Sequence, residues 1–195
     1  MTPVMRLSLR FDQPRLADEL DRLTKLRDFH PMDNQLSLTH FENSEDPLYD
    51  GVGSLFRPHR PASAPTDEAA YSIFHRDLRD WYLHEVYTQV RQFADGAVGR
   101  VRLIRLGPKS CMSLHKDVNF RLHVPIVSNP QCFMIFENYG FFHLAADGSA
   151  YLTDTLGRHT VMNGSDSPRI HMVFSLTGDP ALYRDMMSHN PDVAS

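Results

Sequence analysis

The sequence lacks an uninterrupted apolar run of about 18 residues, so no segment of it is expected to cross a membrane. Its first ten residues have neither a long apolar stretch nor a small-residue cleavage site, and we do not expect a secretory signal there. Excess positive charge is also absent. Lysine and arginine number 20 against 24 acidic residues, and the formal net charge of −4 gives no electrostatic reason to expect a nucleic-acid partner.

Cysteine is scarce as well. Cys111 and Cys132 are too few for a disulfide framework and form no C-x-x-C pair, so we expect ordinary thiols in a reduced, cytoplasmic setting. What the chain does have is a hydrophobic fraction of 42% and a charged fraction of 23%, which are typical of a packed globular protein. Its length of 195 residues favours one domain that spans residues 1–195.

The first half of the chain reads as helices and loops. Apolar residues at helical spacing predict an amphipathic helix over 14–27. A stretch rich in Pro, Ser, Asp and Gly predicts a long loop over 40–68. An aromatic stripe predicts one long or two shorter helices over 67–94, with the stripe packed in the core. We therefore expect residues 1–95 to form a helical and loop part that shapes substrate entry.

From Gly99 the pattern changes to short β-type runs separated by turn signals. No connection between them is long enough for a crossover helix, so a mainly antiparallel sandwich or barrel is expected over 99–178. The predicted strands are 100–106, 120–127, 131–136, 140–144, 149–153, 158–162 and 169–176.

An H-x-D motif precedes one of these strands. In an extended segment residues i and i+2 point the same way, so His115 and Asp117 can converge on one metal ion. One more imidazole would complete two histidines and a carboxylate, a set that leaves open positions on iron(II) for an oxygenase. The chain holds a second H-x-D at 75–77, but it lies in a predicted helix, where i and i+2 do not share a face. We interpret that copy as surface charge.

Two later histidines, His159 and His171, are candidates for the third ligand. We favour His159 because Arg169 follows ten residues later, a spacing that suits one hairpin between adjacent antiparallel strands. Arg169 would then lie deeper in the barrel than the metal. A buried guanidinium needs an anionic partner, and the far carboxylate of a dicarboxylate cosubstrate can supply one.

Polar residues alternate along the strand at 120–127. Arg121 and His123 share one face of it, whereas Leu122, Val124 and Ile126 share the other. If the polar face points inward, it lines a polar cavity where both residues can contact carboxylates of a cosubstrate or substrate. The alternative is that this face points to water.

Taken together, these motifs resemble the aspartyl/asparaginyl β-hydroxylase family, which is related to bacterial proline hydroxylases. The matching segments are RLIRLGP (102–108), HKD (115–117), RLHVPIVSNP (121–130), the HL and Asp-Gly turn of 143–148, RHTVMNGS (158–165) and SPRIHMVFSL (167–176). The resemblance implies a jelly roll, that is, a double-stranded β-helix, with iron(II), 2-oxoglutarate and O2 as the reacting partners.

The resemblance also implies roles for individual residues. His115 and His159 would bind iron, Arg169 would bind the cosubstrate carboxylate, and Arg121 and His123 would line the cosubstrate pocket. Some members of the family have glycine where this chain has Asp117, so the carboxylate here implies a full triad. Beyond the motifs, we expect Arg158 to bind a substrate carboxylate. Asn163 or a backbone carbonyl would orient His159.

The expected reaction is hydroxylation of an unactivated C–H bond of an amino acid or amino-acid residue, with release of succinate and CO2. Two alternatives stay open. One is a cupin-type metalloenzyme that does not use 2-oxoglutarate and has no need of Arg169. The other is a non-catalytic β-barrel binding module whose histidines are incidental. The substrate can be a free amino acid, a peptide residue or a natural-product intermediate.

Overall fold

The computed structural model describes residues 2–56 and 63–189. Its α-helices are α1 (Gln13–Leu26), α2 (Tyr82–Phe93) and α3 (Pro180–His189), with short 3-10 turns η1 (Glu68–Ala70) and η2 (Arg76–Leu78). Within these described ranges, no helix is long and apolar enough to cross a membrane. The predicted loop at 40–68 contains residues 57–62, which lie outside the described residues.

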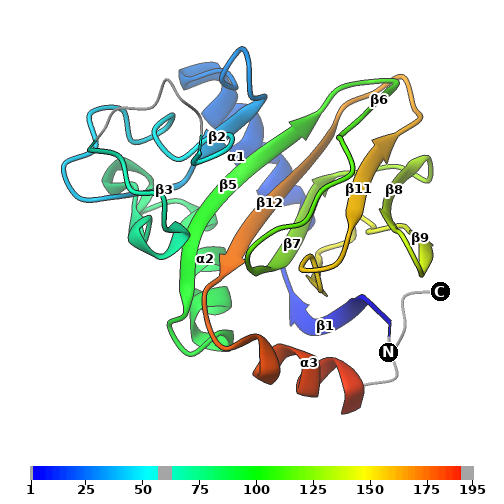
Figure 1. The fold of residues 1–195 in the computed structure, drawn as a ribbon. Coiled ribbons are helices and arrows are strands. Elements are labelled where there is room, and N and C mark those ends of the chain that lie inside the picture. The colour runs from blue at the N-terminus through cyan, green and yellow to red at the C-terminus, as the bar shows by residue number, and fades with distance from the viewer. Residues whose placement is uncertain (1, 57–62, 190–195) are drawn as a thin grey trace.

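Two antiparallel sheets face each other (Figure 1). The larger sheet has the strand order β1-β10-β7-β12-β5-β2, the smaller β6-β11-β8-β9, and a separate pair joins β3 to β4. The larger sheet consists of β1 (Val4–Arg10), β2 (Gln35–Ser37), β5 (Val98–Leu106), β7 (Phe120–Val127), β10 (Ser149–Thr153) and β12 (Arg169–Leu176). The remaining strands are β3 (Thr39–His40), β4 (Ile73–Phe74), β6 (Ser110–Cys111), β8 (Cys132–Phe136), β9 (Gly140–Phe142) and β11 (His159–Asn163).

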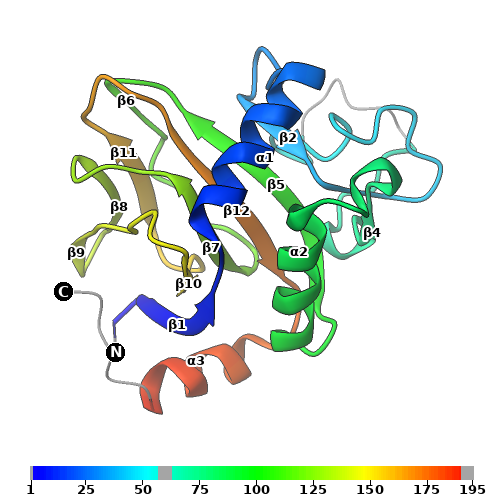
Figure 2. The ribbon, with the colours of Figure 1, turned by 180° about the vertical axis from the view of Figure 1, so that it is seen from behind.

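The helices cover the outer face of the larger sheet, and Figure 2 shows α1 lying across it. The helices pack there because side chains alternate between the two faces of each strand, and one face is apolar. Leu122 and Val124 of β7 and Phe174 of β12 are fully buried in the same core cluster as Leu16 of α1. The alternate residues of these strands point to the other face, between the two sheets. The larger core cluster therefore lies on the helical side, and the space between the sheets holds a smaller apolar cluster beside the polar residues.

The strands predicted after Gly99 are confirmed, each to within two residues at either end. The helix expected over 14–27 is α1, and the aromatic stripe is buried as predicted. Only α2 forms as a regular helix within 67–94, because the part before it is broken into two 3-10 turns and β4. The description of residues 1–95 as helices and loops is also corrected, since β1 and β2 form the two edges of the larger sheet.

One step of the sequence argument was wrong. The ten-residue spacing from His159 to Arg169 does not mark a hairpin, because β11 belongs to the smaller sheet and β12 to the larger one. The connection carries the chain from one sheet to the other through a partly exposed loop. His159 and Arg169 therefore reach the same space from opposite walls.

Candidate metal centre and its cavity

Three of the predicted residues lie together between the sheets. His115, Asp117 and His159 bring one ligand atom each to within 4.8 Å of one another. Backbone bonds hold the group: His115 and His159 exchange both N–H···O=C bonds of an antiparallel bridge, at 3.0 and 2.9 Å. The N–H of Asp117 donates to the Thr155 carbonyl at 2.9 Å. His171, the other candidate for the third ligand, is not part of this group.

Each imidazole of the group is held in a defined tautomer. His115 Nδ1 lies 2.7 Å from the Ser113 carbonyl, and His159 Nδ1 lies 3.0 Å from the Gly157 carbonyl. A carbonyl only accepts, so both Nδ1 atoms carry the proton and both Nε2 lone pairs are free. His159 Nε2 is 3.7 Å from Asp117 Oδ2. Two free Nε2 atoms and a carboxylate oxygen suit a divalent transition metal, as do the carbonyls that orient the rings.

Asp117 is oriented by an arginine. Arg121 Nε and Nη2 each donate to one oxygen of this carboxylate at 2.9 Å, a bidentate pair. Burial raises the pKa of Asp117, but the Arg121 guanidinium outweighs it and brings the pKa down to about 2. The carboxylate is therefore ionised at neutral pH, as a metal ligand must be.

Every N–H donor of Arg121 has a hydrogen-bond partner within the protein. Its remaining donors bond to both oxygens of Glu68 and to Ser175 Oγ, so all five N–H groups have partners. None of these N–H groups is left for the cosubstrate contact that the sequence predicts. Arg121 lines the cavity and holds the carboxylate of Asp117.

The triad opens onto a cavity of about 630 Å³ between the sheets. The prediction that the polar face of β7 points inward is confirmed, because Arg121 and His123 both line this cavity. Both ring nitrogens of the buried His123 lack a hydrogen-bond partner among the described residues. A buried imidazole with no partner is costly unless a ligand satisfies it. His123 is therefore a candidate contact for a bound molecule.

Arg169 also lines the cavity and is 3% exposed. Within the described ranges it has no carboxylate partner; its Nη2 lies 2.7 Å from His171 Nδ1, which accepts the bond. Burial lowers the pKa of Arg169 to about 10, so it stays charged at neutral pH. A buried, unpaired guanidinium is unfavourable by itself and creates a site for an anion. His171 thus orients Arg169 rather than ligating metal.

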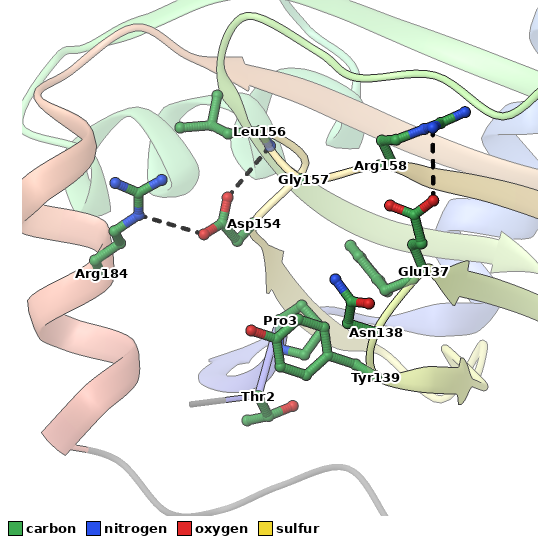
Figure 3. Close-up of a pocket in the computed structure, with 11 residues that line it drawn as sticks. Thr2, Pro3, Glu137, Asn138, Tyr139, Asp154, Leu156, Gly157, Arg158 and Arg184 are labelled. Carbon is green, nitrogen blue, oxygen red and sulfur yellow. Dashed lines mark hydrogen bonds and ion pairs between the residues drawn. The ribbon is translucent and has the colours of Figure 1, made fainter.

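Two further predicted residues lie elsewhere. Figure 3 shows Arg158 in a different pocket, of about 230 Å³, where it pairs with Glu137 at 3.6 Å. The structure does not bring Arg158 to the cavity of the triad. Asn163 does not contact His159 either. Its side-chain amide donates to the carbonyls of Gly107 and Ser167 and fixes the β11–β12 connection. The prediction for Asn163 is corrected, and the backbone alternative, the Gly157 carbonyl, orients His159.

Sequence reasoning missed three buried charged residues of the cavity. Arg100 and Arg102 alternate along β5 with Val101 and Leu103, as Arg121 and His123 alternate along β7. The same period-2 signal therefore could have placed both arginines on the inward face. Glu68, in η1, gave no such signal, because one residue of a 3-10 turn has no periodicity to read.

Glu68 holds this cluster together. Burial raises its pKa, but the guanidiniums of Arg121 and Arg100 outweigh that effect and hold the pKa well below the usual range. Glu68 bonds to both of these arginines. Removing one partner from a buried ion pair typically costs about 3 to 5 kcal/mol. We expect Glu68→Gln to lower the free energy of unfolding at pH 7 by that amount, measured by urea denaturation.

The pH dependence of this loss has a defined sign. A carboxyl whose pKa is lowered by folding stabilises the protein fully above its unfolded pKa, near 4.5, and progressively less below it. The difference between the wild type and Glu68→Gln should therefore narrow as the pH falls below about 4.5. Glu85→Gln, which removes an exposed pair with Arg15, is the control and should change stability by less than about 1 kcal/mol. An equal loss of unfolding free energy in both variants would contradict the role of Glu68 as the residue that holds the buried arginines together.

Comparison with known proteins agrees with the motifs. Residues 82–178 match the family described as Aspartyl/Asparaginyl beta-hydroxylase. Over most of its length the chain is similar in fold to an oxidoreductase of the 2OG-Fe(II) oxygenase family from Burkholderia pseudomallei (TM-score 0.52, 16% identity, covering 90% of this chain and 84% of that one). It is also similar to AviO1 from Streptomyces viridochromogenes Tue57 (TM-score 0.51, 15% identity, covering 92% and 91%).

A Pseudomonas putida prolyl-4-hydroxylase has the same fold, with a TM-score of 0.50 and 6% identity over 92% of this chain and 94% of that one. No curated protein sequence matches the chain. At these identities the solved structures establish the jelly-roll fold alone.

Proposed function

Residues 82–178 carry the aspartyl/asparaginyl β-hydroxylase domain, and from that premise we propose that the protein is an Fe(II)- and 2-oxoglutarate-dependent dioxygenase. Its reaction would hydroxylate a C–H bond of an amino acid or amino-acid residue. One observation carries the proposal: two histidines and an aspartate meet on a cavity that also holds a buried arginine with no carboxylate partner among the described residues.

The proposed ligands of the iron are His115, Asp117 and His159. The donor set fits the metal, since both Nε2 atoms are free and the carboxylate is ionised. When bound, Fe(II) would supply the redox chemistry by which O2 and 2-oxoglutarate yield the hydroxylated product, succinate and CO2. The protein supplies position and a protected cavity for that chemistry.

The roles of the other residues follow from their contacts. Arg121 holds the Asp117 carboxylate in place, and Glu68 holds Arg121. Arg169, oriented by His171, would donate to the far carboxylate of 2-oxoglutarate. His123, with both nitrogens unsatisfied, would donate to an oxygen of the same molecule or of the substrate. The cavity volume, about 630 Å³, is in the range of small-molecule sites and suits a small substrate beside the cosubstrate.

The direct test is turnover. Protein loaded with Fe(II) under anaerobic conditions and then exposed to O2 should convert 2-oxoglutarate to succinate, and a suitable amino acid or short peptide should accelerate this and gain about 16 mass units. A panel of free amino acids and short peptides, read by mass spectrometry, covers the proposed substrate class. The proposal fails if the loaded protein releases no succinate above the metal-free control with any member of the panel.

A further inference from the structure

Large apolar side chains gather at the opening of the cavity. The described residues expose ten such side chains, and four of the ten line this one cavity. The four are Met32 (81% exposed), Phe56 (73%), Val118 (67%) and Met112 (37%), and we call them the apolar rim. Met32 and Phe56 come from loops of the N-terminal half. Met112 and Val118 lie on either side of the segment 113–117, which carries two ligands of the triad.

The apolar surface at the rim is confined to this opening. Apart from Leu114, which follows Met112 in the same segment, the other exposed large apolar side chains lie on α1, on β4, on β9 and the turn before it, and on α3. Single exposed apolar side chains are common on proteins, whereas several of them at one opening mark a binding site. A molecule bound in the cavity can cover the rim, because all four rim residues belong to the cavity lining.

The polarity of the cavity lining changes with depth. Arg169 and His123 are buried, and their N–H groups or ring nitrogens lack a carboxylate partner among the described residues. The lining that faces solvent is mainly apolar, and Lys116 is the one exposed charged residue in its described part. A molecule that complements this lining has a polar end beside the triad and an apolar part at the opening. A small polar amino acid would leave the rim exposed to water.

Two kinds of partner have apolar surface to place on the rim, a chain attached to a small molecule and the surface of a folded protein. A standard protein interface takes about 20 to 30 residues from each side. The rim and Leu114 supply only five apolar side chains, and two rim residues are methionines, whose flexible side chains adapt to ligands of varied shape. These features favour the small molecule.

We propose that the apolar rim binds an acyl or alkyl chain of the substrate. The molecule to be hydroxylated is then an amphipathic amino-acid derivative, with its polar end beside the triad and its chain on Met32, Phe56, Met112 and Val118. This inference rests on the proposed function for its meaning and narrows the substrate class from amino acids in general to those that carry an apolar chain.

Binding can be measured without turnover. The metal-free full-length chain is titrated with N-acetylglycine and with N-octanoylglycine, and the dissociation constants are read by ligand-observed NMR. A fully buried methylene contributes about fourfold to affinity, and a partly exposed one contributes less. N-octanoylglycine, with six more methylenes, should therefore bind the wild type about tenfold or more tightly than N-acetylglycine. Met32→Gln combined with Phe56→Ser should weaken N-octanoylglycine binding about fivefold or more and change N-acetylglycine binding less than about twofold.

The matched control is Leu182→Gln combined with Phe141→Ser. These two side chains are 66% and 65% exposed but do not line the cavity, so binding of both probes should stay at the wild-type level. If the rim variant loses its folded circular-dichroism signal, Val118→Thr replaces it. That change keeps the volume nearly constant and should weaken N-octanoylglycine binding about twofold or more. Equal affinities of the wild type for the two probes, or equal losses in the rim and control variants, overturn the inference.

Turnover then connects the rim to the substrate. With the Fe(II)-loaded protein, N-octanoyl amino acids should stimulate succinate release at lower concentrations than the free amino acids. The rim variant should raise the KM for the stimulating N-octanoyl compound about fivefold or more and change the KM for 2-oxoglutarate less than about twofold. A free amino acid with a lower KM than its N-octanoyl derivative would overturn the inference. If no compound stimulates turnover, the proposed function fails, whereas the titrations still decide whether the rim binds an apolar chain.

Discussion

Replacing His159 with alanine is expected to lower the affinity for Fe(II) by more than about 100-fold and to reduce 2-oxoglutarate-dependent succinate release to background. Groups that only orient a metal ligand typically contribute 10- to 100-fold to metal affinity, so removing a ligand itself should exceed that range. Iron content after anaerobic loading and desalting measures the first effect. Succinate, quantified by mass spectrometry, measures the second. His115→Ala should behave in the same way, because the Nε2 of His115 is also free and the residue belongs to the same group of three.

The chain contains a matched control for this experiment. His75 and Asp77 repeat the H-x-D spacing, but in the structure they contact each other. His75 is the N-cap of η2, and its Nδ1 accepts the N–H of Asp77 at 3.3 Å. His75→Ala should therefore retain iron and succinate release. Iron retention by His159→Ala at the wild-type level, or an equal loss in His75→Ala, would contradict the triad.

The strands could be predicted from the sequence because each half-buried strand repeats its polarity every two residues. β7 shows why this is enough: Leu122 and Val124 pack under α1, while Arg121 and His123 face the cavity. The assignment of each strand to one of the two sheets could not be predicted from the sequence. The route from His159 to Arg169 resembles a hairpin in spacing, and only three-dimensional packing shows that it passes from one sheet to the other.

The candidate site was predictable where local spacing determines geometry and unpredictable where partners come from distant segments. His115 and Asp117 share a direction because they are two residues apart in extended chain. The engagement of Arg121, in contrast, depends on Glu68, which is 53 residues away and sits in a 3-10 turn. The orientation of His159 depends on the carbonyl of Gly157. Every residue has a backbone carbonyl, so the sequence does not indicate which one makes this contact.

Arg169→Met is the second substitution for which we expect a large effect, a rise of about 100-fold in the KM for 2-oxoglutarate with iron binding intact. Truncating one partner of a buried, hydrogen-bonded charge pair typically costs about 2 to 5 kcal/mol. Arg169 is such a partner if its donors bind the far carboxylate of the cosubstrate. The KM is read from succinate release at increasing 2-oxoglutarate, and iron content is measured on the same samples. Arg105→Met, on the neighbouring strand with its side chain on the other face, should leave both values unchanged.

Stability separates this role from a structural one. Without a bound anion, the only polar contact of Arg169 among the described residues is His171, so its buried charge is a cost to the folded protein. Methionine removes that cost and fills a similar volume, and the metal-free variant should therefore melt no lower than the wild type. Added 2-oxoglutarate should raise the melting temperature of the wild type with iron-site metal bound and leave that of the variant nearly unchanged. A variant that is as stable as the wild type yet unable to use 2-oxoglutarate would identify a residue kept for binding. An unchanged KM would show that Arg169 does not bind the cosubstrate, whereas a wild type that binds iron but does not turn over 2-oxoglutarate would favour the cupin-type reading.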